Sequence, residues 1–265
     1  MLDKRGSDTI KCAMHRSARL SAILERLANG TSVAVADLAV DLAASPATIR
    51  RDLAMLERQR LLARTHGGAV AHTVTYELPL RYKGVRHAEE KQRIARAAAG
   101  SVSEGMAVGL TGGTTATELA RALAGKQQIT IVTNALNIAS ELGLRPNLKL
   151  IVTGGLVRSR TYELSGPLAE ASLTGLNLDV AFIGVDGIDA RAGCTTHQEV
   201  EAHANGVMIQ HARRVIVVAD SSKIGKVTFA RICEAAAVDE LVTDNAAEPE
   251  AVRALTDAGV HVTLV

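Results

Sequence analysis

The sequence predicts an α/β protein of two domains, in which a small N-terminal winged helix-turn-helix domain precedes a larger, mostly parallel α/β domain. Three observations predict this architecture. Apolar residues keep a helical period up to about residue 56, a glycine turn follows near residue 67, and from residue 89 short apolar runs alternate with helical segments. The chain has 265 residues, of which 47% are hydrophobic, so it can fill a sizeable core.

Two helices are expected at the start of the first domain. Leu20, Ile23, Leu24 and Leu27 follow the i, i+3, i+4, i+7 spacing of one helical face, and Asn29-Gly30 ends the pattern. The same spacing recurs between residues 35 and 42. We therefore predict helices over about residues 16–28 and 35–42.

A third helix is predicted to begin at Pro46, because proline suits the first helical turn and Ser45 can cap the free N–H groups there. Its buried stripe is Ile49, Leu53 and Leu56. The opposite face pairs small residues with two arginines, which can approach a DNA major groove closely and bind guanine or phosphate. The candidate DNA contacts of this segment are Ser45, Ala47, Thr48, Arg50 and Arg51.

A wing is predicted after the third helix, because residues 61–64 resemble a strand and residues 65–69 contain a glycine turn. Arg64 and His66 are expected to contact DNA phosphates. Residues 1–70 contain eleven Lys and Arg and seven Asp and Glu, against 19 and 21 in the remainder, so a basic domain precedes a slightly acidic one. Periodicity alone leaves open a small helical domain whose arginines merely face solvent.

The remaining features exclude several classes of protein. No run of about 18 apolar residues exists and residues 1–14 lack a signal-peptide pattern, so we expect a cytoplasmic protein. Cys12, Cys194 and Cys233 are far apart and lack metal-ligand spacing, so we predict reduced thiols, no metal and no cofactor. Residues 1–14 are expected to be a tail, with Met14 as a candidate true start.

The predicted domains are residues 15–70 and 88–265, with a linker over residues 71–87 where the periodicity lapses. Six strands are expected in the second domain. They cover residues 107–110, 129–132, 148–152, 180–183, 215–219 and 260–265.

Ligands of parallel sheets bind at the carboxyl ends of the strands, and the residues that follow these runs are polar or glycine-rich. Glycines, hydroxyls and a helix N-terminus after residue 110 suit a phosphate, while an amide, a carboxylate and a lysine at other strand ends suit sugar hydroxyls and an anion. Each alone also fits an ordinary cap or turn. The candidate ligand-binding residues are Gly112, Gly113, Thr114, Thr115, Thr133, Asn134, Gly154, Gly155, Asp186 and Lys223.

These motifs closely resemble those of the DeoR family of bacterial transcription regulators. In the first domain the matches are Leu38-Ala39, Ser45-x-x-Thr48-Ile49-Arg50-Arg51-Asp52-Leu53-x-x-Leu56-Glu57 and Arg64-x-His66-Gly67-Gly68-Ala69. In the second they are Glu90-Lys91-x-x-Ile94-Ala95, Gly113-Thr114-Thr115-x-x-Glu118-Leu119-Ala120, Val132-Thr133-Asn134, Gly154-Gly155, Ser165-Gly166-Pro167, Phe182-Ile183-Gly184 and Asp220-Ser221-Ser222-Lys223. Thr111 departs from the family, which usually carries aspartate there, and Gln59-Arg60 stands where the family usually has a glycine.

The resemblance implies a DNA-binding repressor of a carbohydrate-catabolic operon, relieved when a phosphorylated sugar binds a ribose-5-phosphate-isomerase-like effector domain. It also implies operator DNA as a partner and a homo-oligomer, a dimer or tetramer. An isomerase-like enzyme is the alternative, because Asp186-Gly187-Ile188-Asp189 resembles an isomerase segment and Glu199 follows where those enzymes place their base. A DNA-binding architectural protein without an effector is disfavoured by the size of the second domain.

Overall fold

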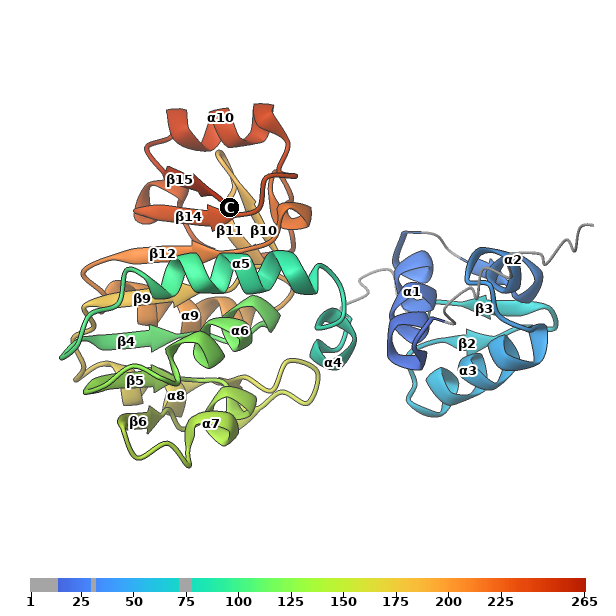
Figure 1. Ribbon diagram of the computed structural model, residues 1–265, viewed down its shortest axis with the longest axis horizontal. Helices are drawn as coiled ribbons and strands as arrows, with labels where there is room; N and C mark the ends of the chain where they lie inside the picture. The colour runs from blue at the N-terminus through green and yellow to red at the C-terminus, as the bar shows by residue number, and fades with distance from the viewer. Residues whose placement is uncertain (1–13, 30–31, 72–77) are drawn as a thin grey trace, which may run out of the picture. The chain divides into compact units, whose positions relative to one another are not determined.

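The computed structural model describes residues 14–29, 32–71 and 78–265, and the chain divides into two compact units between Leu78 and Pro79 (Figure 1). The predicted tail, apart from Met14, lies outside the described residues. Within the described ranges, no helix combines the length and apolar character that crossing a bilayer requires.

The first unit contains three helices and a three-stranded sheet. The helices are α1 (Arg16–Asn29), α2 (Val35–Asp41) and α3 (Pro46–Arg58), and the strands are β1 (Ser32–Ala34), β2 (Ala63–Arg64) and β3 (Gly68–Val70). The predicted stripes of α1 and α3 are buried and form the core. Each such side chain contributes about 1.5–3 kcal/mol by leaving water. The three predicted helices and the wing are therefore confirmed.

Strand β1 was not predicted, because three residues carry too little alternation to be recognised. It pairs antiparallel with β3, which also pairs with β2, so β3 is the central strand of the wing. A Cβ at Gly68 would lie 1.8 Å from the carbonyl oxygen of Val33. Glycine is therefore required at position 68 for β1 to pair with β3.

The second unit is built on a seven-stranded sheet in the order β15-β14-β12-β9-β4-β5-β6, and every pairing in it is parallel. The strands are β4 (Ala107–Leu110), β5 (Ile129–Thr133), β6 (Leu148–Val152), β9 (Val180–Ile183), β12 (Val215–Val218), β14 (Glu240–Thr243) and β15 (His261–Leu264). Six of these were predicted, and the mostly parallel α/β fold is confirmed. Strand β14 was missed.

Helices cover both faces of this sheet (Figure 1). One face packs against α5 (Ala88–Ala99), α6 (Thr114–Leu123) and α7 (Leu136–Leu142), and the other against α8 (Pro167–Leu173), α9 (Glu199–Gln210) and α10 (Pro249–Asp257). Val180 and Phe182 enter the first core, whereas Ala181 and Ile183 enter the second. This alternation follows from the two-residue period of a strand that is buried on both faces.

Smaller elements complete the second unit. An antiparallel sheet contains β10 (Gly187–Asp189), β11 (Gly193–Thr196) and β13 (Ala230–Cys233), and β7 (Leu156–Val157) pairs with β8 (Leu164–Ser165). Short 3₁₀ turns, η1 (Ser221–Lys223) and η2 (Ala235–Ala237), flank β13.

Residues 79–87 belong to the second unit, although we predicted them as part of the linker. They include the short helix α4 (Leu80–Lys83), in which Leu80 and Tyr82 are buried, and the Leu80 N–H donates to the carbonyl of Arg160 at 2.8 Å. Their apolar residues are too few for a recognisable period, so the sequence pattern resembled a linker.

Candidate functional site

The N-terminus of α3 is fixed by the predicted cap. The backbone N–H of Thr48 donates to Ser45 Oγ at 3.2 Å, and the two hydroxyls lie 2.8 Å apart. Ala47, Arg50 and Arg51 are exposed. The helix therefore presents the face that the sequence predicted, although direct DNA contact by these residues stays a prediction.

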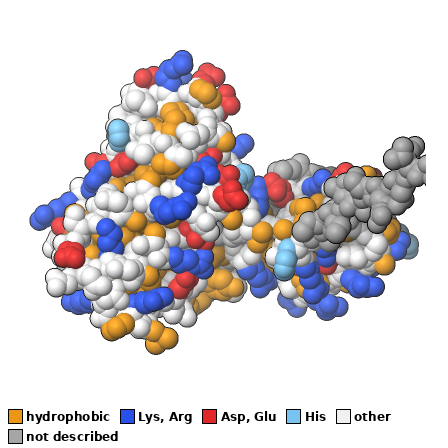
Figure 2. All heavy atoms as spheres, viewed as in Figure 1, with side chains coloured by type: hydrophobic (Ala, Val, Ile, Leu, Met, Phe, Trp, Pro, Cys, Tyr) orange, Lys and Arg blue, Asp and Glu red, His pale blue; other side chains and the backbone are white. Residues whose placement is uncertain are grey.

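A groove lies between α3 and the wing. Its lining includes Arg50 from the helix together with Arg64 and His66 from the wing turn, so three of the candidate DNA contacts share one concave surface. Figure 2 shows Lys and Arg side chains gathered along the lower margin of this unit. Positive charge around a groove of this kind suits a phosphate backbone.

Asp52, on the opposite side of α3 from Arg50, is buried. Its carboxylate accepts a hydrogen bond from Arg19 Nε at 2.6 Å and lies 3.6 Å from Arg16 Nε. These contacts of Asp52 with Arg19 and Arg16 connect α3 to α1. Asp52 thus fixes the orientation of the helix that carries the arginines.

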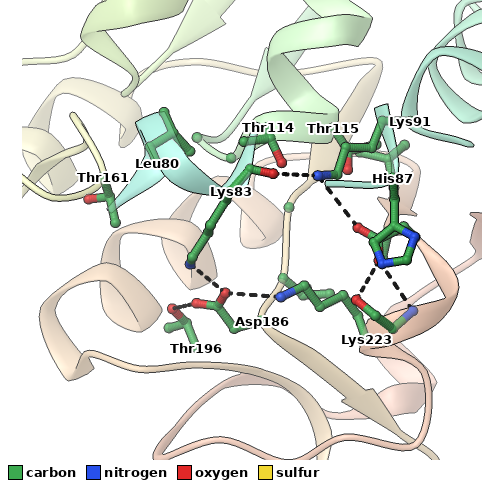
Figure 3. A pocket seen from close by; sticks show the side chains of 18 of the residues that line it. Leu80, Lys83, His87, Lys91, Thr114, Thr115, Thr161, Asp186, Thr196 and Lys223 are labelled. Atoms are coloured by element: carbon green, nitrogen blue, oxygen red, sulfur yellow. Dashed lines mark hydrogen bonds and ion pairs between the residues drawn. The ribbon is translucent and has the colours of Figure 1, made fainter. Parts of the chain in front are cut away.

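The second unit holds a pocket at the carboxyl ends of β4, β9 and β12 (Figure 3). Six of the ten candidate ligand-binding residues line it, namely Gly112, Gly113, Thr114, Thr115, Asp186 and Lys223. Their convergence follows from the parallel topology, which brings the ends of strands distant in sequence to one edge.

The other four candidates lie outside the lining and have structural contacts. Thr133 donates to the carbonyl of Leu110 at 2.7 Å, and Asn134 Nδ2 donates to Asn205 Oδ1 at 3.0 Å. Gly154 and Gly155 pack against β8 and α8. Asn134 therefore lies one layer behind the pocket, supporting Asn205, which does line it.

One end of the pocket suits an anion. Helix α6 begins at Thr114 without a side-chain cap, so its first N–H groups and positive dipole end face the pocket beside the Thr114 and Thr115 hydroxyls. A Cβ at Gly184 would lie 2.4 Å from the carbonyl oxygen of Gly112, so glycine at position 184 lets the two loops approach this closely. Thr111 accepts a hydrogen bond from the Gly184 N–H at 2.8 Å and thereby ties these loops together.

Two lysines converge on Asp186 from opposite sides (Figure 3). Lys83 Nζ lies 2.8 Å and Lys223 Nζ 3.6 Å from Asp186 Oδ1. Burial opposes ionisation of Asp186, but Lys83, Lys223 and His197 outweigh it and lower the pKa of this carboxyl. Asp186 is therefore a carboxylate that holds two cations in the pocket.

Lys91 is a buried lysine of α5 that supports the pocket wall. Its ammonium donates to the carbonyls of Lys83 at 2.8 Å and Arg86 at 2.5 Å, and lies 3.9 Å from Asp220. Burial lowers its pKa to about 8, although the Asp220 charge acts in the opposite direction. Lys91 thus fixes the backbone of residues 83–86.

The pocket also holds two acidic residues, of which Glu163 lies directly against Gly112. Glu201 pairs with Arg158 and accepts a hydrogen bond from Thr161, while Glu163 accepts one from Asn205 at 3.4 Å. Burial and the neighbouring Glu201 charge raise the pKa of Glu163 to about 8, so it is largely protonated at neutral pH. Carboxyl, amide and hydroxyl groups together suit a ligand with several hydroxyls.

Sequence reasoning missed most of the lining. The residues it did not identify are Leu80, Lys83, Arg86, His87, Lys91, Thr161, Glu163, Gly184, Val185, Thr196, Glu201, Asn205, Val218, Ala219, Asp220 and Ser222. Several belong to segments that precede the strands or lie within helices, where no strand-end rule applies. Lys91, Gly184, Asp220 and Ser222 belong to motifs shared with the DeoR family, and Asp220 and Ser222 follow a predicted strand, but none of the four was among the predicted ligand-binding residues.

Of the residues that suggested an isomerase, Asp186 lines the pocket, whereas Asp189 and Glu199 do not. Asp189 accepts hydrogen bonds from the N–H groups of Arg191 and Ala192, both at 2.9 Å, and so caps a turn. Glu199 is exposed at the start of α9 and borders a different groove.

Comparison with known proteins gives matches over both units. Residues 19–75 match the DeoR-like helix-turn-helix domain and residues 86–245 match the DeoR C terminal sensor domain. The full-length sorbitol operon regulator SorC from Klebsiella pneumoniae is 14% identical, with a TM-score of 0.40, and the alignment covers 89% of this chain and 98% of that one. A ribose 5-phosphate isomerase from Methanocaldococcus jannaschii is 17% identical, with a TM-score of 0.38, over 53% of this chain and 56% of that one.

Curated relatives align over nearly their whole length. The regulator GlpR of Haloferax volcanii is 36% identical, with 91% of this chain and 94% of the relative covered. The glycerol-3-phosphate regulon repressor of Escherichia coli K12 is 30% identical, covering 95% and 100%. The transcriptional repressor AccR of Agrobacterium fabrum is 36% identical, covering 86% and 89%. The sequence motifs, the two matched domains and these relatives agree, and the chain belongs to the DeoR family of DNA-binding transcription regulators.

Proposed function

We propose that this chain represses a carbohydrate-catabolic operon and releases its operator when a phosphorylated sugar or polyol binds the pocket. The observation that carries the proposal is the mixed lining of the pocket, in which the N-terminus of α6 and the ammonium groups of Lys83 and Lys223 lie beside buried carboxyl, amide and hydroxyl groups. Repression is supported by relatives named as repressors, one of them of a glycerol-3-phosphate regulon.

The phosphate would accept hydrogen bonds from the first N–H groups of α6 and from Thr114 and Thr115. Lys223 and Lys83 would supply positive charge. The hydroxyls of the ligand would meet Glu201 and Asn205. A ligand that lacks either end would leave one set of polar groups without partners, which lowers its affinity.

Lys83 offers a route from the pocket to DNA binding. It belongs to α4, the first element of the second unit after the segment that joins the two units. A bound phosphate competes with Asp186 for its ammonium, and Lys91 holds the backbone of the same segment. We propose that the ligand shifts residues 80–87 and thereby changes how the DNA-binding unit is presented.

Such coupling requires that the ligand bind the two arrangements unequally. A coupling of about 1–3 kcal/mol changes DNA affinity roughly 5–150-fold, which is enough for induction. We also propose a cytoplasmic homo-oligomer, a dimer or tetramer, that presents two or more recognition helices to repeated half-sites on chromosomal DNA. Sedimentation of the full chain with and without operator measures the oligomer size.

The first experiment identifies the ligand class. The melting temperature of the full chain is measured with a panel of sugar and polyol phosphates, their unphosphorylated counterparts and inorganic phosphate. We expect a phosphorylated polyol to raise the melting temperature and to release DNA selected by the protein from a random library. Stabilisation by unphosphorylated sugars alone would contradict the anion site, and failure to select DNA would contradict the regulator.

Thr115→Val then tests the placement of the anion site. Thr115 is buried in the first turn of α6, and valine keeps its shape but removes the hydroxyl. We expect repression to persist while the ligand concentration needed for DNA release rises by roughly tenfold or more. Thr130→Val, on β5 outside the pocket, is the matched control. Full induction of Thr115→Val would show that the phosphate binds elsewhere.

An isomerase remains a second candidate because Lys83, Asp186 and Glu201 are acid and base groups in one pocket. We propose that the pocket senses its ligand without turning it over, and the relatives named as regulators support this. A coupled assay with pentose and hexose phosphates tests it, since turnover above background would establish an enzyme.

A further inference from the structure

Cys194 and Cys233 are distant in sequence but lie opposite one another in the small antiparallel sheet. They are register partners on β11 and β13, and their thiols are hydrogen-bonded to each other. Directly opposed residues of antiparallel strands have Cα atoms about 4.5–5.5 Å apart. A disulfide spans about 4.4–6.8 Å between Cα atoms, so paired positions of this kind can accommodate one, here beside a β-bulge between Cys194 and Thr195.

The two thiols differ in environment. Cys194 is fully buried in the core, whereas Cys233 is partly exposed at the end of an edge strand. The hydrogen bond to Cys233 and burial both raise the pKa of Cys194. Hydrogen bonds donated by Cys194 lower the pKa of Cys233, although burial acts against them. Cys233 is thus the accessible sulfur with greater thiolate character, and Cys194 lies ready to attack it.

We propose that Cys194 and Cys233 form a reversible disulfide when the protein meets a peroxide, which makes this sheet a redox modification site. The Cys233 thiolate attacks hydrogen peroxide, the O–O bond breaks, and Cys233 becomes a sulfenic acid as hydroxide leaves. The Cys194 sulfur then attacks the Cys233 sulfur, the S–O bond breaks and water leaves. A dithiol reductant reverses the reaction.

The site borders the effector pocket. Two residues after Cys194, Thr196 lines the pocket and donates to Asp186 at 3.2 Å. The disulfide would draw together two sulfurs that are now only hydrogen-bonded, and would bind β11 covalently to β13. The proposal concerns the sheet itself and holds whichever ligand the pocket binds.

The test uses the full chain carrying Cys12→Ser, so that the two proposed partners are the only thiols. The folded Cys12→Ser protein is treated with hydrogen peroxide. It is then unfolded, its remaining thiols are alkylated, and its intact mass is measured. We expect a loss of about 2 Da without alkylation, and full alkylation after dithiothreitol, as for a reversible disulfide. Two alkylated thiols after peroxide treatment, or a covalent dimer on a non-reducing gel, would overturn the proposal.

Single-cysteine variants test the order of reaction. In Cys12→Ser/Cys194→Ala, we expect dimedone to trap a sulfenic acid on Cys233. In Cys12→Ser/Cys233→Ala, we expect the buried Cys194 to react at least tenfold more slowly, because its thiol is inaccessible and protonated. Faster trapping at Cys194 would overturn the assigned roles. Circular dichroism first establishes that each variant is folded, and the Cys12→Ser experiment alone decides whether the disulfide forms.

Discussion

Three carboxyls, two of them buried and one partly buried, illustrate how surroundings decide what one functional group does. Asp52 is paired with arginines and anchors a helix, while Asp186 is held ionised by lysines inside the pocket. Glu163 is buried beside Glu201, and burial together with that neighbouring charge raises its pKa and favours its neutral form. The neutral carboxyl can both donate and accept, which suits recognition of a hydroxyl.

Asp52→Asn tests the anchor between α3 and α1. We expect it to destabilise the first unit by about 2–3 kcal/mol, because Arg19 loses its counter-charge in a mostly buried position. Hydrogen exchange of the α1 and α3 amides in the full chain measures the change. Asp41→Asn is the control, since Asp41 and Arg26 form an exposed pair worth less than about 1 kcal/mol. Equal effects of both variants would contradict the anchoring role.

Glu163 makes the stability of the second unit depend on pH. The unfolded chain loses this proton at the ordinary pKa of 4.5, whereas the folded chain keeps it to about 8. Between these values the folded state binds the extra proton, so the free energy of unfolding falls as pH rises, by up to about 1.4 kcal/mol per pH unit. Glu163→Gln should remove the contribution of Glu163 to this pH dependence. The free energy of unfolding of the variant, measured by urea denaturation at a series of pH values, should therefore change less with pH than that of the wild type. Parallel profiles would contradict the assignment.

At the scale of elements, the wing and α3 work as one surface. The groove between them is lined by residues from both, and β3 is held between β1 and β2. The position of Arg64 and His66 therefore depends on pairing within a sheet of very short strands.

Gly68→Ala is expected to disrupt this surface, because the added methyl would overlap the Val33 carbonyl and separate β1 from β3. We expect at least a tenfold loss of DNA affinity, measured by fluorescence anisotropy with the selected operator. Gly67→Ala is a matched control, since a Cβ there meets no atom within 4 Å. If Gly68→Ala binds DNA as well as Gly67→Ala does, DNA binding by the wing does not depend on the close pairing of β1 with β3.

At the scale of the whole molecule, residues 80–87 are the segment through which the pocket and the DNA-binding unit are covalently connected. Lys83 pairs with Asp186, and Lys91 fixes the backbone beside it. This arrangement gives the proposed coupling a defined starting point.

Lys83→Met tests that coupling. Asp186 keeps Lys223 and His197 as partners, and a ligand keeps the anion site at α6, so we expect ligand binding to persist. The ligand-induced loss of DNA affinity should fall from roughly 5–150-fold to less than about twofold. Calorimetry measures binding and anisotropy measures DNA release. Lys149→Met, on the exposed side of edge strand β6, is the control. Normal release by Lys83→Met would exclude this route.

The sequence by itself determined the features that depend on local periodicity and local chemistry. Hydrophobic spacing identified α1, α2 and α3, Ser45 and Pro46 marked the start of the recognition helix, and apolar runs identified six of the seven parallel strands. The strand-end rule also indicated that the Gly112–Thr115 loop, Asp186 and Lys223 share one edge of the sheet, where they line the pocket, because parallel topology places these positions together.

Only the tertiary structure decided which polar residues meet in the pocket and which support it. Lys83 and Glu163 enter it from segments with no strand-end signal, Asn134 lies behind it, and Cys194 reaches Cys233 through sheet pairing. The physical reason is that such contacts join residues far apart in the chain. Their distance and burial depend on how the elements pack, and no local pattern of residues contains that information.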